Sequence, residues 1–301
     1  MADRVDISVI VDNYIDIFLP PMGNVTYPFP GPASRLLAEQ GLSLAVDVWN
    51  EGSVIRIIYD FGRSEEVFLH NASLLDINFN DLDYLVLSHG HVDHYGSLQH
   101  ILTTTGKSRL FAHPEVSGRK RYMRLQNGDF AGPWELKAEI LNEFKSRISL
   151  SANPSFIASD IIVSGEIERQ TDFEKGMPNA FVEVGGDLTH DRIRDDQALF
   201  IDLEGRGIVL LTGCCHAGLV NTLLYALKIL PGRPVYAVIG GFHLNNADEK
   251  QMNETIEYLR SLNIRYLAAL HCTGYYAARR LMQAFHDQWI AGTVGAQITM
   301  H

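Results

Sequence analysis

Four side chains of metal-binding type fall within six residues of one another, at His89, His91, Asp93 and His94. His89 and His91 are two residues apart, so in an extended segment their side chains point the same way. Asp93 and His94 follow where the chain turns toward a helix, so the four groups can converge on two nearby points. Burying them together without a metal or hydrogen-bond partners would cost free energy. Imidazole and carboxylate suit zinc, iron or manganese, and the segment therefore predicts a metal site.

Further candidates follow later strands of the chain. Alternation along an extended segment puts Cys214 and His216 on one side and Cys215, expected to be a small buried residue, on the other. A thiolate ligand favours zinc or iron over a hard ion such as magnesium. His271 and His243 also stand at predicted strand ends, and His243 lies beside glycines that let a ligand approach. We expect His243 to contact substrate or transfer a proton, although a capping or packing role is the alternative.

The elements that must position these residues alternate along the chain. Val, Ile and aromatic runs predict strands, and apolar residues at a helical period predict helices. Ser64 followed by acids predicts a helix start. This alternation indicates a layered α/β protein. The expected strands are 5–12, 42–49, 54–60, 82–88, 197–203, 207–212, 235–239 and 265–270. The expected helices are 64–75, one starting near His94, 133–145, 217–229, 248–261 and 274–286.

Two segments between these elements are expected to shape a pocket. Residues 19–32 contain five prolines and two glycines and predict a long ordered loop. Residues 113–165 form an insert that includes a basic segment at 117–124. That segment is either a solvated helix face or a wall that attracts an anionic substrate.

Composition limits the function. The chain has 301 residues, 46% of them hydrophobic, and no Pro- or Gly/Ser-rich linker, so we expect one domain over 1–301. A net charge of −11 argues against non-specific nucleic-acid binding but not against a phosphorylated small substrate at a bound metal. Three cysteines, no leader and no apolar run near the ~20 residues that span a bilayer predict a cytoplasmic protein without a membrane segment. The oligomeric state is not predicted.

Ser-His-Gly-His-Val-Asp-His at 88–94 resembles the His-x-His-x-Asp-His signature of the metallo-β-lactamase superfamily. The resemblance implies an αββα sandwich with the site at one end of its central sheets. It also implies that His89 and His91 hold one metal, and that Asp93 and His94 serve a second.

The same resemblance assigns residues from the later strands. In the family a Thr-Gly-Asp segment supplies an aspartate that bridges the two metals, and Cys214 occupies that place here. His271 matches the family's last histidine. The family's Pro-Gly-His segment, which supplies a third histidine for the first metal, has no match. His190, an aspartate near it or His216 is then the replacement, and the direction of its side chain favours His216.

Several segments together resemble one branch of the superfamily, the dihydropterin-(ribofuranosyl)aminobenzene-phosphate synthase-like proteins. Among them are Gly-Cys-Cys-His-Ala-Gly at 213–218 and His-Cys-Thr-Gly at 271–274. The branch implies a synthase that condenses a pterin diphosphate with an aromatic amine. The substrate of this chain does not follow from the motifs.

The leading hypothesis is hydrolysis of a phosphoester, or of a related ester or amide bond, by hydroxide formed at two divalent metals. Zinc is favoured, and iron or manganese also fit. Asp93 would orient the water and take its proton, and His216 or His243 would protonate the leaving group. Asp195 or Asp196 would fix ligand tautomers. The alternatives are the synthase, a di-iron redox protein and a non-catalytic binding protein.

Overall fold

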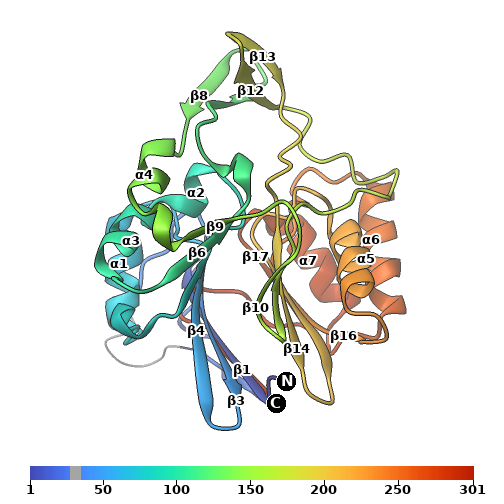
Figure 1. Ribbon diagram of the computed structural model, residues 1–301. Helices are drawn as coiled ribbons and strands as arrows, with labels where there is room; N and C mark the ends of the chain where they lie inside the picture. Colours follow the sequence, from blue (N-terminus) through green and yellow to red (C-terminus); the bar gives the residue numbers. More distant parts are fainter. Residues whose placement is uncertain (28–34) are drawn as a thin grey trace.

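A computed structural model describes residues 1–27 and 35–301, in which two β-sheets pack face to face and helices cover both outer faces (Figure 1). The first sheet has the strand order β2-β18-β1-β3-β4-β5-β6-β9, and the second has the order β10-β11-β14-β15-β16-β17. This arrangement confirms the predicted αββα sandwich. Within the described residues no helix is long and apolar enough to cross a membrane.

The first sheet and its helices come mostly from the N-terminal half of the chain. Its strands are β1 (Arg4–Val11), β2 (Val25–Thr26), β3 (Ser43–Asn50), β4 (Ser53–Tyr59), β5 (Tyr84–Val86), β6 (Arg109–Ala112), β9 (Ile148–Leu150) and β18 (Gln297–Met300). Its helices are α1 (Glu65–Leu74), α2 (Val92–Tyr95), α3 (Leu98–Thr104) and α4 (Ala138–Glu143). Short 3-10 turns lie at Phe79–Asp81, Pro114–Val116 and Lys145–Arg147.

The second sheet and its helices come from the C-terminal half. Its strands are β10 (Ser155–Ala158), β11 (Ile161–Val163), β14 (Ala198–Leu203), β15 (Gly207–Thr212), β16 (Val235–Gly241) and β17 (Tyr266–Leu270). Its helices are α5 (Leu219–Ile229), α6 (Glu249–Ser261) and α7 (Tyr275–Ala284), and a 3-10 turn, η5 (His271–Thr273), follows β17.

Alternating residues of the central strands supply two separate cores. On β14, Leu199 and Ile201 pack into the layer between the two sheets, whereas Phe200 packs against the layer of α5, α6 and α7. All residues of β14 and β15 are buried, as expected for strands covered on both faces. A third apolar cluster fills the space between the first sheet and its helices. The two inner faces therefore hold the ends of both sheets at fixed positions.

A third, four-stranded sheet projects beyond the sandwich, with the order β13-β12-β7-β8 (Figure 1). Its strands are β7 (Arg121–Arg124), β8 (Phe130–Trp134), β12 (Ala180–Val184) and β13 (Asp187–His190). The basic segment 117–124 thus ends in a strand rather than forming a helix. Acidic side chains neutralise most of the charge of this segment. The ion pairs are Arg119 with Glu115, Lys120 with Glu183, and Arg121 with Asp191 and Asp195.

Most predicted elements lie within two or three residues of their observed bounds, and Ser64 Oγ caps α1 as expected by accepting from Val67 N. The predicted helix 133–145 is wrong in its first part, where Pro133 lies in β8 and helix α4 begins only at Ala138. A proline has no N–H to donate within a helix. The predicted loop contains the edge strand β2, which pairs with β18, and its residues 28–32 lie outside the described residues.

Candidate metal centre

The predicted ligands lie at the carboxyl ends of parallel strands in both sheets, where sites of layered α/β proteins form. Strand β5 runs parallel to β4 and β6 and leads into His89. Strands β15, β16 and β17 are also parallel to one another, and they lead into Cys214, His243 and His271. Gly90 permits the close approach of the Val116 main chain to the segment after β5, because a Cβ there would lie 2.3 Å from Val116 O.

One group of ligands consists of three imidazoles, His89, His91 and His216. His216 Nε2 lies 3.2 Å from His89 Nε2, and the rings of His91 and His216 have centroids 4.8 Å apart. Burial lowers the pKa of all three rings, that of His91 to about 3. Each ring is therefore neutral near pH 7 and able to bind a cation.

A second group consists of Asp93, His94 and His271. Asp93 Oδ2 lies 3.5 Å from His271 Nε2, and Asp93 Oδ1 lies 3.9 Å from His94 Nε2. Burial lowers the pKa of His94, but the adjacent Asp60 carboxylate outweighs burial and raises it to about 9. Burial raises the pKa of Asp93, but its hydrogen bond to His271 and the nearby imidazoles hold it well below its usual range. Without a metal, the second group thus contains an ion pair of opposite charges near pH 7, whereas the first group consists of neutral rings.

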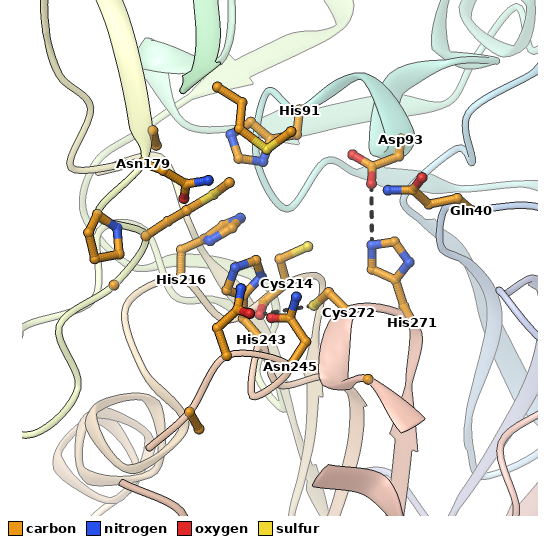
Figure 2. A pocket seen from close by; sticks show the side chains of 18 of the residues that line it. Gln40, His91, Asp93, Asn179, Cys214, His216, His243, Asn245, His271 and Cys272 are labelled. Atoms are coloured by element: carbon orange, nitrogen blue, oxygen red, sulfur yellow. Dashed lines mark hydrogen bonds and ion pairs between the residues drawn. The ribbon is translucent and has the colours of Figure 1, made fainter. Parts of the chain in front are cut away.

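Cys214 stands between the two groups, as Figure 2 shows. Its Sγ lies within 4.8 Å of ligand atoms of His89 and His216 on one side, and of His94 and His271 on the other. Its distance to His94 Nε2 is 3.2 Å. Burial raises the pKa of the thiol, so metal binding there would release a proton.

The polar atoms of this cluster fit metal binding. His216 Nδ1 is buried and has no hydrogen-bond partner in the part of the chain that the structure describes, and the buried His271 Nε2 has only its 3.5 Å contact with Asp93 Oδ2. Such atoms are costly unless a ligand or ion satisfies them. Cys215 differs, because its Sγ contacts Thr222 Oγ1 at 3.3 Å and packs among the helices of the second sheet. This placement agrees with the structural role expected for Cys215.

Two side-chain acceptors, one buried and one partly buried, orient the second group and were missed from the sequence. Asp60 Oδ2 accepts from His94 Nδ1 at 2.6 Å and from Ser88 Oγ at 2.7 Å. Asn13 Oδ1 accepts from His271 Nδ1 at 2.9 Å, which leaves the other ring nitrogen for a metal. Asp60 directly follows strand β4, so an acid at the end of a buried strand beside the motif strand was the available signal.

Other buried groups hold the backbone of the ligand loops. Asp195 Oδ2 accepts from Gly90 N at 2.8 Å, and Asp196 Oδ2 accepts from Ala217 N at 2.8 Å. Arg169 Nη1 donates to His216 O at 3.2 Å. The expectation that Asp195 or Asp196 fixes ligand tautomers is therefore wrong, since both hydrogen bonds go to main-chain groups. They place the loops rather than the rings.

Left-handed backbone concentrates at the centre. Asp60, Cys215, His243 and His271 have φ values of 62°, 62°, 44° and 47°, which are unfavourable for side chains other than glycine. Such strain persists only where the surroundings enforce it, and it clusters at functional sites.

His190, the alternative ligand, lies exposed on β13 with its Nε2 near Met177 O, so the structure does not bring it to the cluster. His216 occupies the place for which His190 was the alternative.

A cavity of about 710 Å³ opens above the cluster, and both predicted catalytic residues, Asp93 and His243, line it. The projecting sheet forms one wall, so part of the insert 113–165 shapes the pocket as expected. None of residues 19–27 lines the cavity. Further aromatic, thioether, amide and basic residues line the walls: Tyr122, Met123, Trp134, Phe173, Met177, Gln40, Asn179, Asn245, Arg63, Arg121 and Lys175.

Comparison with known proteins gives consistent results. The family model for the metallo-beta-lactamase superfamily matches residues 43–119. The 7,8-dihydropterin-6-methyl-4-(beta-D-ribofuranosyl)-aminobenzene-5'-phosphate synthase of Methanocaldococcus jannaschii is 32% identical over 267 residues, covering 87% of this chain and 90% of that protein. An uncharacterised protein of the same organism, MJ0448, is 29% identical over 87% of this chain and 93% of its own length.

A solved structure shares the fold over almost the whole chain. Tm1679, described as a metal-dependent hydrolase of the beta-lactamase superfamily, superposes with a TM-score of 0.74 at 23% identity and covers 99% of this chain and 98% of its own. At this identity the likeness shows the fold.

Proposed function

Since the chain belongs to the metallo-β-lactamase superfamily, we propose that it is an enzyme that holds two divalent metal ions, zinc being favoured. His89, His91 and His216 would hold the first ion, and Asp93, His94 and His271 the second. Cys214 would bridge them. The observation that carries the proposal is the position of Cys214 Sγ within 4.8 Å of ligand atoms of both groups, on a cavity wall.

The reaction we propose is hydrolysis of a phosphoester, or of a related ester or amide bond, in a small anionic substrate. Two bound metals supply hydroxide near neutral pH and polarise the oxygen of the scissile group. Asp93 lines the cavity, and we assign it the orientation of the attacking water and acceptance of its proton. His243 lines the same cavity with an unpartnered buried Nδ1, which supports substrate contact or proton donation to the leaving group. Arg63 and Lys175 on the wall would attract the anion.

A second candidate is a synthase that joins an aromatic amine to a pterin-type diphosphate with release of diphosphate. The 32% identical relative carries that kind of name, and it matches this chain over most of both lengths. The same groups of residues would then act on a leaving diphosphate, with the amine in the place of water.

Elemental analysis of protein purified without added metal tests the centre, and two assays test the reaction. The proposed pair requires at least about two metal equivalents per chain. Turnover of a generic phosphodiester without any amine would support the hydrolase. Diphosphate release from a pterin diphosphate only when the aromatic amine is present would select the synthase. Protein that contains no metal and binds none on titration would refute the proposed centre.

A further inference from the structure

A third set of metal-binding side chains contains Cys214, the proposed bridge, together with two residues that belong to neither of the two ligand groups. The ligand atoms of Cys214, His243 and Cys272 all lie within 4.8 Å of one another. All three residues line the cavity. Figure 2 shows His243 and Cys272 beside Cys214, on the side away from His91.

The fold makes room for this third set. A Cβ on Gly241 would lie 2.7 Å from Cys272 Sγ and 2.4 Å from Gly213 O, so only a glycine there leaves space for the sulfur. Phe242 N donates to Thr273 Oγ1 at 3.0 Å. This bond joins the residue before His243 to the residue after Cys272. The two loops are therefore held together at the point where their side chains meet.

The state of the three side chains points to a missing ligand. His243 has a left-handed backbone with φ 44°, and its buried Nδ1 has no hydrogen-bond partner among the described residues. Cys272 is a free thiol whose Sγ donates to Cys214 O at 3.4 Å, and Cys214 is also free. A strained backbone that places an unsatisfied buried ring nitrogen beside two thiols is costly unless something binds there.

We propose that Cys214, His243 and Cys272 hold a third divalent cation of the soft class, such as zinc, beside the two ions of the proposed function. Two cysteines and one histidine with a position left open are a known ligand set for zinc. Cys214 already serves the proposed pair as a thiolate, so binding of the third ion would release to solvent only the thiol proton of Cys272. His243 is then a ligand in place of the proton donor described above, and the third ion adds positive charge to the cavity where an anionic substrate would enter.

Cobalt(II) titration of the metal-free, fully reduced protein tests this inference, because thiolate–cobalt bonds absorb in the near ultraviolet. Wild-type protein should bind about three equivalents, and Cys272→Ser and His243→Gln should each bind about two. Cys272→Ser should lose about half of the thiolate absorption and keep the part due to Cys214. Cys215→Ser is the matched control, since Cys215 packs against Thr222, and it should behave as wild type.

The two variants remove different ligands, and the circular dichroism spectrum of each shows whether it has folded. Wild-type protein that binds only two equivalents, or a folded Cys272→Ser or His243→Gln that binds as many as wild type, overturns the third ion. The inference rests on the proposed function only because the third ion shares Cys214 with the proposed pair. The experiment can therefore refute the third ion without refuting the pair. Two equivalents in wild type, with one lost in His91→Ala, would leave the proposed pair intact and refute only the third ion.

Discussion

His94 and His271 each donate a ring N–H to a side chain, the buried Asp60 and the partly buried Asn13 respectively, whereas His216 Nδ1 has no such partner among the described residues. In the first group only His89 has a side-chain partner of this kind, with its Nδ1 2.9 Å from Ser88 Oγ, and the other support acts on the main chain through Asp195, Asp196 and Arg169. The second group therefore has its tautomers fixed before a metal arrives. The first group has its loops placed, while its imidazoles stay neutral because they are buried together.

This difference indicates how each proposed ion depends on its surroundings. A hydrogen bond to a ligand ring raises the basicity of that ring and fixes its orientation, so its loss acts directly on metal affinity. A hydrogen bond to the main chain acts on the stability of the loop, and through it on the metal. Substitutions behind the second group should thus change affinity, and those behind the first should change stability.

The largest effect is expected from His91→Ala, which removes a ligand rather than its support. This variant should lose about one metal equivalent and more than about 100-fold in turnover, since residues behind ligands already cost about 10–100-fold. Elemental analysis and steady-state kinetics check both. His190→Ala, on exposed β13, is the control and should keep both properties. Full metal content and turnover in His91→Ala would show that the first group is wrongly assigned.

Asp60→Asn should weaken the second ion by about 10–100-fold, because it changes the acceptor of His94 Nδ1. The first ion should change less, through Ser88, whose Oγ contacts both Asp60 and His89 Nδ1. Competition with a chromophoric chelator resolves the two affinities. Asp47→Asn on β3 is the matched control, since Asp47 pairs with Arg56 at the sheet surface. Equal weakening of both ions would contradict the separation drawn above.

Asp196→Ala should act on stability first. It leaves the buried Ala217 N–H without its acceptor and should lower the free energy of unfolding by about 1–3 kcal/mol. Affinity for the first ion should fall by less than about tenfold. Urea unfolding of the metal-free protein and chelator competition measure the two effects. An affinity loss without any loss of stability would mean that Asp196 acts on the metal directly.

The smallest effect is expected at the surface beside the first group, where Glu166 accepts from Arg194, the neighbour of Asp195. The hydrogen bond from Arg194 lowers the pKa of Glu166 below its ordinary 4.5. The ion pair therefore stabilises the fold above about pH 4.5, and this contribution is lost as pH falls through the lowered pKa. Because the pair is largely exposed, Glu166→Gln should cost less than about 1 kcal/mol at pH 7 and nothing at low pH.

Urea unfolding of wild type and Glu166→Gln, at pH 7 and at a pH below the lowered pKa of Glu166, tests that prediction. Glu257→Gln, on α6, is the control and should show no such pH-dependent difference. A cost for Glu166→Gln that grows as pH falls would reverse the expected sign.

The sequence predicted the parts of the centre that depend on local geometry. The spacing of His89 to His94 and the alternation of Cys214 and His216 require only a strand end and a turn, and the structure brings these side chains together. Whether they bind metal stays a prediction. Asp60 and Asn13 could not be found in this way, because they reach His94 and His271 across 34 and 258 residues of sequence. No local pattern encodes such contacts.

The prediction of the fold had the same limit, because contacts between residues far apart in sequence leave no local pattern. The αββα sandwich was predicted by resemblance and the element order by periodicity, but the projecting sheet was not, because β7 and β12 pair across more than fifty residues. The predicted helix over 133–145 begins too early because Trp134 pairs with Arg121 of β7, which makes residues 130–134 a strand of the projecting sheet.

The pairing of β1 with β18 has a consequence for synthesis of the protein. Val5 lies opposite Met300, so the outer edge of β1 stays uncovered until the ribosome has also made β18, far later in the chain. The His89–His94 segment likewise leaves the ribosome well before His271. Until then the edge of β1 can pair with other chains, and such an edge invites aggregation. The first sheet and the proposed metal centre are therefore completed only after these distant segments have been made, and chaperones that shield β-edges should raise the yield of folded protein.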